Sequence, residues 1–125
     1  MKKFILACLF LVSAFSFALE KSGIKEYDSL DISKGKIIAY YNTKKQIVEE
    51  PAAMFYRKDY GKKGNYHLVA DFYADTDTPE KIFMLRDLDD EDSINGKLAY
   101  YNKNETISYV ADMKNGRIDG QKTTF

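Results

Sequence analysis

Residues 96–107 read GKLAYYNKNETI, and residues 35–47 read GKIIAYYNTKKQI. Each stretch begins with Gly-Lys, continues with a doubled Tyr and an Asn, and reaches an Ile at the same distance from the second Tyr. A pattern that recurs within one chain indicates a structural unit that is repeated. The sequence therefore predicts a fold built from copies of one small element.

The clearest copy is the stretch GKLAYYNKNETISYVADMKNGRIDG, residues 96–120. Residues 98–101 and 106–113 are rich in Tyr, Ile, Val and Thr, which favour strands, and a polar turn separates them. The following Asn115-Gly116 predicts a second tight turn, because a type I′ hairpin needs positive φ at two positions and these residues tolerate it. The unit is thus expected to be a β-hairpin that leads directly into another strand.

Earlier parts of the chain carry weaker copies of this unit, over residues 35–63 and 64–95, before the copy at 96–119 and a partial copy at 120–125. In the second copy, residues 70–73 (ADFY) replace residues 99–101 (AYY). Neighbouring residues in a strand point to opposite faces, so one aromatic residue of each doublet is expected in a core. The doublets are Tyr40/Tyr41, Phe72/Tyr73 and Tyr100/Tyr101. No amphipathic helix is predicted, since Pro51 interrupts the best candidate.

The last full copy resembles the MORN repeat family, in its bacterial variant. The matching residues are Gly96, Tyr100, Tyr101, Asn104, Ile107, Asn115, Gly116 and Gly120, and looser matches are Gly35, Tyr40, Tyr41, Gly64, Phe72 and Tyr73. Glu105 and Met113 depart from the usual Gly and aromatic residue. The resemblance implies an all-β protein, a meander of hairpins in an elongated, curved antiparallel sheet. Its last strand is expected to be covered by residues 24–34 or to pair with another chain.

The N-terminus has the features of a secretory signal peptide, with Lys2-Lys3 before an apolar run that ends in Ser-Phe-Ala. We predict cleavage after Ala18, with Ala14 as the alternative, and an exported protein of the periplasm, cell surface or medium. A lipoprotein anchor at Cys8 is a further alternative, although this cysteine lies close to Met1. Residues 19–34 are then a lead-in or cap for the repeats.

Composition excludes several classes of function. The chain has 19 Lys and Arg against 19 Asp and Glu, which does not suit a nucleic-acid binder. His67 is the only histidine, and the only cysteine lies in the signal peptide, so a Ser-His-Asp or Cys-His site has little to be built from. Asp71, Asp87 and Asp112 recur at equivalent places, which indicates turns or strand ends. We therefore expect a non-enzymatic protein without a cofactor.

An acidic run at residues 87–92 raises a calcium hypothesis, because calcium prefers several carboxylate oxygens from one loop. The run lacks the Gly and the terminal Glu that an EF-hand loop needs, so a solvated loop is the preferred interpretation.

Residues 56–67 collect the opposite charge, where Arg57, Lys58, Lys62 and Lys63 alternate with tyrosines. Such a segment suits an anionic lipid surface or an acidic partner, although a solvated hairpin end is the simpler interpretation. Our first functional prediction is a protein-interaction module that holds a partner, or a second copy, on its sheet face. Peripheral membrane binding is the alternative, and the resemblance adds an antitoxin-like component of a toxin pair as a third.

Overall fold

The computed structural model describes residues 19–125, and the predicted signal peptide lies outside this range. The elements in chain order are α2 (Lys25–Asp28), β1 (Lys36–Tyr41), η1 (Glu50–Ala52), β2 (Phe55–Lys63), β3 (Tyr66–Tyr73), β4 (Thr78–Leu85), η2 (Glu91–Ser93), β5 (Gly96–Tyr101), β6 (Ile107–Lys114) and β7 (Arg117–Thr124). None of the helices in the described part of the chain has the length and apolar character to cross a membrane.

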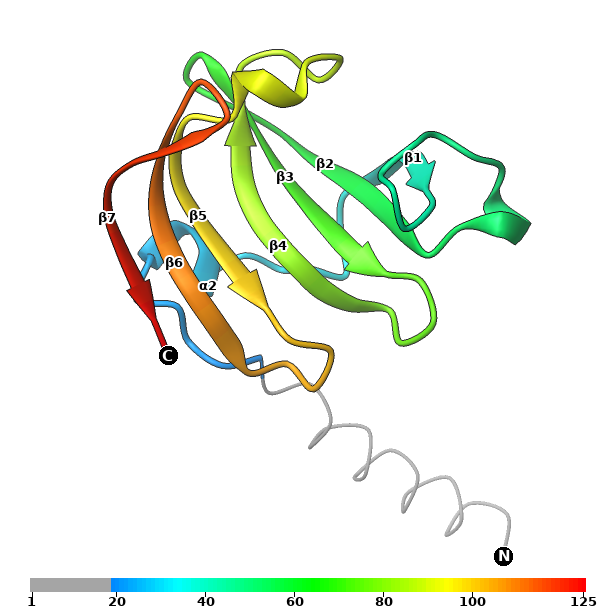
Figure 1. Cartoon of the computed structure of the whole chain (residues 1–125), viewed down its shortest axis with the longest axis horizontal. Coiled ribbons are helices and arrows are strands. Elements are labelled where there is room, and N and C mark those ends of the chain that lie inside the picture. The colour runs from blue at the N-terminus through cyan, green and yellow to red at the C-terminus, as the bar shows by residue number, and fades with distance from the viewer. Residues whose placement is uncertain (1–18) are drawn as a thin grey trace, which may run out of the picture.

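The seven strands form one open antiparallel sheet, in which each strand lies beside its neighbour in the sequence (Figure 1). The predicted all-β meander is therefore confirmed. Residues 64–95 contain β3 and β4, and residues 96–119 contain β5 and β6. The β6–β7 turn also follows the prediction, because Asn115 and Gly116 have φ of 50° and 79°, as a type I′ hairpin requires.

The two stretches that read AYYN form the same local turn. In one, Asn42 N donates to Gln46 O at 3.0 Å, and in the other Asn102 N donates to Thr106 O at 2.9 Å. Lys45 and Glu105 occupy the same place in the two turns and have φ of 61° and 70°. The repetition in the sequence thus corresponds to a repetition of backbone conformation.

In these two hairpins, however, the segment that follows the turn pairs with opposite edges of the strand that precedes it. The strand that follows the second turn is β6, which pairs with β5 on the C-terminal side of the sheet. After the first turn, Val48 N donates to Tyr40 O at 3.0 Å, whereas Met54 N, which leads into β2, donates to Tyr41 O at 2.8 Å. Successive carbonyls of a strand point to opposite edges. Residues 46–48 therefore line the outer edge of β1, and β2 occupies its inner edge.

The reversed mounting exchanges the faces of the two tyrosines. Tyr101 packs with Phe72 on one face of the sheet, and Tyr100 points to the other. In β1 the first tyrosine, Tyr40, lies on the same face as Phe72. Its ring centroid is 6.3 Å from that of Tyr56, which stacks on Phe72. Tyr41 lies on the opposite face. The prediction that the members of each doublet point to opposite faces is confirmed.

One face of the sheet is covered by residues 19–34, which we call the N-terminal strap and which crosses behind the strands in Figure 1. Tyr27 is 2% exposed, and its hydroxyl donates to Lys97 O. Glu20 Oε1 accepts from Ile107 N at 2.8 Å, and Tyr60 Oη donates to Ile32 O at 2.9 Å. The strap thus packs across the face of the sheet instead of along β7, and this strap face holds the larger apolar core.

The opposite face, which we call the open face, has a second apolar cluster at one end only. Val69, Phe83, Leu85 and Leu98 are buried there together with Ile94 of the segment 87–95. Gly116 N donates to Ile94 O at 2.9 Å and attaches this segment to the β6–β7 turn. At the other end of the open face, Lys45 of the turn after β1 reaches over Phe55 and pairs with Glu80, and the neighbouring side chains are charged or aromatic.

Candidate interaction face

A β-bulge organises the charged part of the open face. In the β3–β4 register Asp71 pairs with Lys81 and Phe72 with Pro79, so Glu80 is an extra residue in β4. A bulge breaks the alternation of faces. Glu80 and Lys81 are therefore both directed to the open face, where alternation alone would have placed Glu80 among the apolar residues under the strap.

The centre of this face is a buried ion pair between Arg57 of β2 and Asp71 of β3. Arg57 Nε lies 2.6 Å from Asp71 Oδ1 and its Nη2 lies 3.0 Å from Oδ2, while the two residues are 1% and 0% exposed. Burial alone would lower the pKa of Arg57, but the hydrogen bonds and charge of Asp71 outweigh it and raise that pKa. The guanidinium lies between the rings of Tyr41 and Phe83, at 5.1 and 5.0 Å. It is thus a fixed part of the fold.

Glu80 connects this pair to the aromatic end of the face. It is 3% exposed, and its carboxylate accepts from Lys45 Nζ at 2.5 Å and from Tyr100 Oη at 3.0 Å. Lys45 in turn lies 3.6 Å from the ring centroid of Phe55. The turn that follows β1 is therefore tied to the middle of the sheet by a lysine, and the carboxylate is fully used in holding it.

Four half-buried aromatic residues continue across the face, and we call them the aromatic strip: Phe55, Tyr73, Tyr100 and Tyr109. The ring centroids of Phe55 and Tyr73 are 5.8 Å apart, and those of Tyr100 and Tyr109 are 5.2 Å apart and stacked. Lys103 and Lys122 lie over the rings of Tyr73 and Tyr109, at 5.6 and 4.5 Å. The strip extends over β2, β3, β5 and β6, so its spacing is fixed by the sheet.

Partial burial changes the pKa of two tyrosines in the strip. Burial raises the pKa of Tyr100 and Tyr109, and the nearby charge of Glu80 raises it further. Their hydroxyls are therefore neutral at any physiological pH. The strip therefore offers a neutral aromatic surface. The lysines beside it, Lys103 and Lys122, already place their charges over rings of the strip.

The glycines and Asn104 of the predicted repeat signature determine the backbone conformation of turns and strand ends. Gly35, Gly64, Gly96, Gly116 and Gly120 all have positive φ. Asn104 Oδ1 accepts from Thr106 Oγ1 at 2.6 Å within its own turn. Of the whole signature, only Tyr73 and Tyr100 belong to the aromatic strip.

The predicted basic patch is not assembled on one surface. Arg57 is buried on the open face, and Lys58 on the strap face donates to Ile32 O at 3.1 Å. Lys62 and Lys63 are exposed near the β2–β3 turn. Alternation along β2 explains the split, since Arg57 and Lys58 must point to opposite sides.

The remaining candidates also have structural surroundings. His67 Nδ1 lies 3.6 Å from Asp59 Oδ2. In the acidic run, Asp87 and Asp90 accept from backbone N–H groups of their own loop, and Glu91 pairs with Arg57. Over residues 19–125, no three His, Cys, Asp or Glu side chains gather in a way that could hold a metal ion.

Sequence reasoning missed Lys45 and Glu80, which join the ion pair to the strip. Glu80 is hidden by the bulge, which Pro79 beside it permits but does not by itself specify. Lys45 is hidden because its partner is 35 positions further along the chain.

Comparison with known proteins adds no relative to this description. No protein-family model, no curated protein and no solved structure matches the chain. The MORN resemblance therefore stays a prediction, and function has to be argued from the geometry.

Proposed function

We propose that this chain is an exported, non-enzymatic interaction module that holds a protein partner against the aromatic strip. The observation that carries the proposal is the strip itself, four partly exposed rings that lie in two contacting pairs on one face of the sheet. Tyrosine and phenylalanine are enriched in protein interfaces, because they bury a large area at a small entropy cost.

The chemistry around the strip favours binding over catalysis. Arg57, Asp71 and Glu80 are each engaged by more than one neighbour and are at most 3% exposed, so they are poorly placed to reach a substrate. Networks of this kind hold a surface in a single shape. A rigid surface with aromatic residues at its centre is the arrangement in which a few side chains supply most of the binding energy.

Membrane binding is less well supported, because the basic segment is divided between the two faces and the β2–β3 turn. No observation in the structure favours an antitoxin-like role. The export part of the proposal rests on the sequence of residues 1–18 alone.

The test is capture of the partner from the envelope and medium of the native organism, with mass spectrometry of the proteins that elute in stoichiometric amount. The variant pair Phe55→Ala and Tyr109→Ala removes both ends of the strip. We expect it to reduce capture by about tenfold or more, since the truncation of a hot-spot residue, a class in which tyrosine is enriched, costs about 2 kcal/mol or more.

Tyr40→Ala is the matched control, because this tyrosine is also half-exposed and packs on a second tyrosine, but on the strap face. It should leave capture unchanged. Equal loss in both variants, or elution of lipid without protein, would overturn the proposal.

A further inference from the structure

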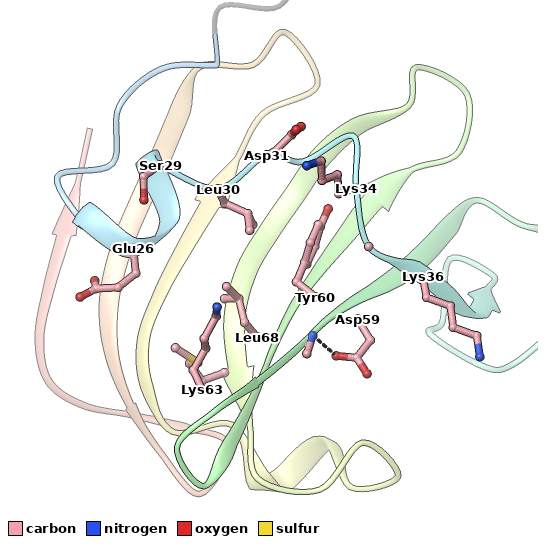
Figure 2. Close-up of a pocket in the computed structure, with 13 residues that line it drawn as sticks. Glu26, Ser29, Leu30, Asp31, Lys34, Lys36, Asp59, Tyr60, Lys63 and Leu68 are labelled. Carbon is pink, nitrogen blue, oxygen red and sulfur yellow. Dashed lines mark hydrogen bonds between the residues drawn. The ribbon is translucent and has the colours of Figure 1, made fainter.

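A cleft of about 810 Å³ opens between the N-terminal strap and strands β2, β3 and β4, on the face opposite the aromatic strip (Figure 2). Leu30 enters it from the strap, Leu68 and Met84 come from the sheet, and the ring of Tyr60 forms one wall. Tyr60 is held in place by its hydrogen bond to Ile32 O. We call this hollow the strap cleft, and its inner surface is apolar.

The charges around the strap cleft differ in where they point. In Figure 2, Lys63 extends its amine toward Leu68, and Lys34 lies on the opposite rim. Glu26 and Asp31 direct their carboxylates away from the centre. The ion pairs of residues 19–125 include neither lysine. Lys63 is therefore a cation at the cleft that forms no ion pair within residues 19–125.

Of the three carboxylates that line the cleft, those of Asp59 and Asp31 are already engaged. Asp59 Oδ1 accepts from Gly61 N at 2.9 Å, and its Oδ2 faces His67. Asp31 Oδ1 accepts from Ser33 Oγ at 2.6 Å and from Ser33 N at 3.1 Å, and these bonds lower the pKa of Asp31. Neither group is free to turn toward Lys63 without losing hydrogen bonds.

We propose that the strap cleft binds a single-chain organic carboxylate, with its apolar body between Leu30, Leu68 and Met84 and its carboxylate at Lys63. The cleft volume falls within the range of about 300–1,000 Å³ that small-molecule sites occupy. A protein partner would need a contact area of about 1,000 Å² or more, which a hollow of this size does not offer. An anion at Lys63 would also gain a charge-assisted hydrogen bond. This site is independent of the proposed protein-binding function.

The test uses dodecanoate below its micelle concentration, added to protein that has been expressed from the full-length sequence and purified. Affinity is measured by calorimetry, and the site is mapped by shifts of ¹⁵N–¹H resonances. We expect saturable binding, with the largest shifts at Leu30, Leu68 and Met84. Lys63→Ala should weaken binding about tenfold, the value of one charge-assisted hydrogen bond.

Two comparisons make this result specific. Lys62→Ala removes the neighbouring exposed lysine, which does not line the cleft, and should leave the affinity for dodecanoate unchanged. Dodecanol has the same apolar chain without the charge and should bind the original protein as weakly as dodecanoate binds Lys63→Ala.

Three outcomes would overturn the proposal. The first is equal binding of dodecanoate and dodecanol, and the second is an equal effect of the two lysine variants. The third is an absence of shifts with dodecanoate while the cleft resonances change with protein concentration, which would show that a second copy covers the cleft.

Discussion

Arg57 and Asp71 are paired neighbours on β2 and β3, and their side chains form a two-point ion pair that is almost wholly withdrawn from water. The attraction between such groups offsets their loss of hydration only while both are present. The pair is therefore a place where removing one partner and removing both should have very different effects.

The first prediction follows from this asymmetry. Asp71→Ala should lower the free energy of unfolding by about 3–5 kcal/mol, because it leaves Arg57 as a buried charge with only the exposed Glu91 beside it. Arg57→Met combined with Asp71→Leu should lose much less. Urea denaturation measures both. Asp112→Ala, which removes the exposed pair with Lys97, should cost far less stability than Asp71→Ala. A double variant as unstable as Asp71→Ala would contradict the argument.

The second prediction concerns the attachment of the strap. Tyr27→Phe removes only the hydroxyl that bonds Lys97 O, and should cost about 1 kcal/mol, whereas Tyr27→Ala also leaves a cavity and should cost about 3–5 kcal/mol. Hydrogen exchange should then show faster exchange at the amides of residues 27–30 than at those of β3. Uniformly faster exchange across the whole sheet would mean that strap and sheet unfold as one unit.

The third prediction compares two glycines with positive φ. An added Cβ at Gly116 would lie 2.9 Å from Asp92 Cα, whereas nothing lies within 4 Å of one at Gly64. Each change to Ala pays about 1–2 kcal/mol for the left-handed conformation, and the effect on the unfolded chain is the same for both. Gly116→Ala should therefore lower the urea midpoint further than Gly64→Ala does. Equal midpoints would show that the segment 87–95 moves aside at no cost.

The fourth prediction is a loss of stability in alkali. Burial raises the pKa of Tyr101 from 10.0 to about 12 and also raises that of Tyr27. A group with a raised pKa in the folded state contributes its full stability below its unfolded pKa and loses it as pH rises toward the folded value. The contribution of these tyrosines to stability should thus be constant below about pH 10 and fall between pH 10 and 12.

Absorbance of ionised tyrosine and circular dichroism, followed together, measure this transition. Tyr101→Phe should make the loss of stability with pH less steep, because one of the titrating groups is removed. An unchanged slope in this variant would assign the alkaline transition to other tyrosines.

The hairpins and their turns could be predicted from the sequence, because local signals determine them. Asn115-Gly116 fixes its turn through backbone φ alone, and the recurring AYYN marks a turn wherever it occurs. The alternation of the aromatic doublets followed from strand geometry. None of these inferences required knowledge of which strands meet.

Other features depend on contacts between distant residues, and local sequence does not determine them. The strap has no periodicity that would indicate which face it covers. The bulge at Glu80 changes the face of a single residue, and with it the whole charge network. Because a doubled tyrosine presents a ring to either face, the pattern is the same whichever way its hairpin is mounted.

The reversed first hairpin also makes the two edges of the sheet different, because one edge is already occupied and the other is not. At Tyr40 and Tyr41 the outer edge of β1 is occupied by residues 46–48, whereas β7 is the last strand and all eight of its residues are exposed. An engineered hairpin could be appended after β7 without displacing an existing bond, but one placed before β1 would have to displace that segment. Lengthening of this architecture is therefore directional, and a designer would extend it only from the C-terminal side.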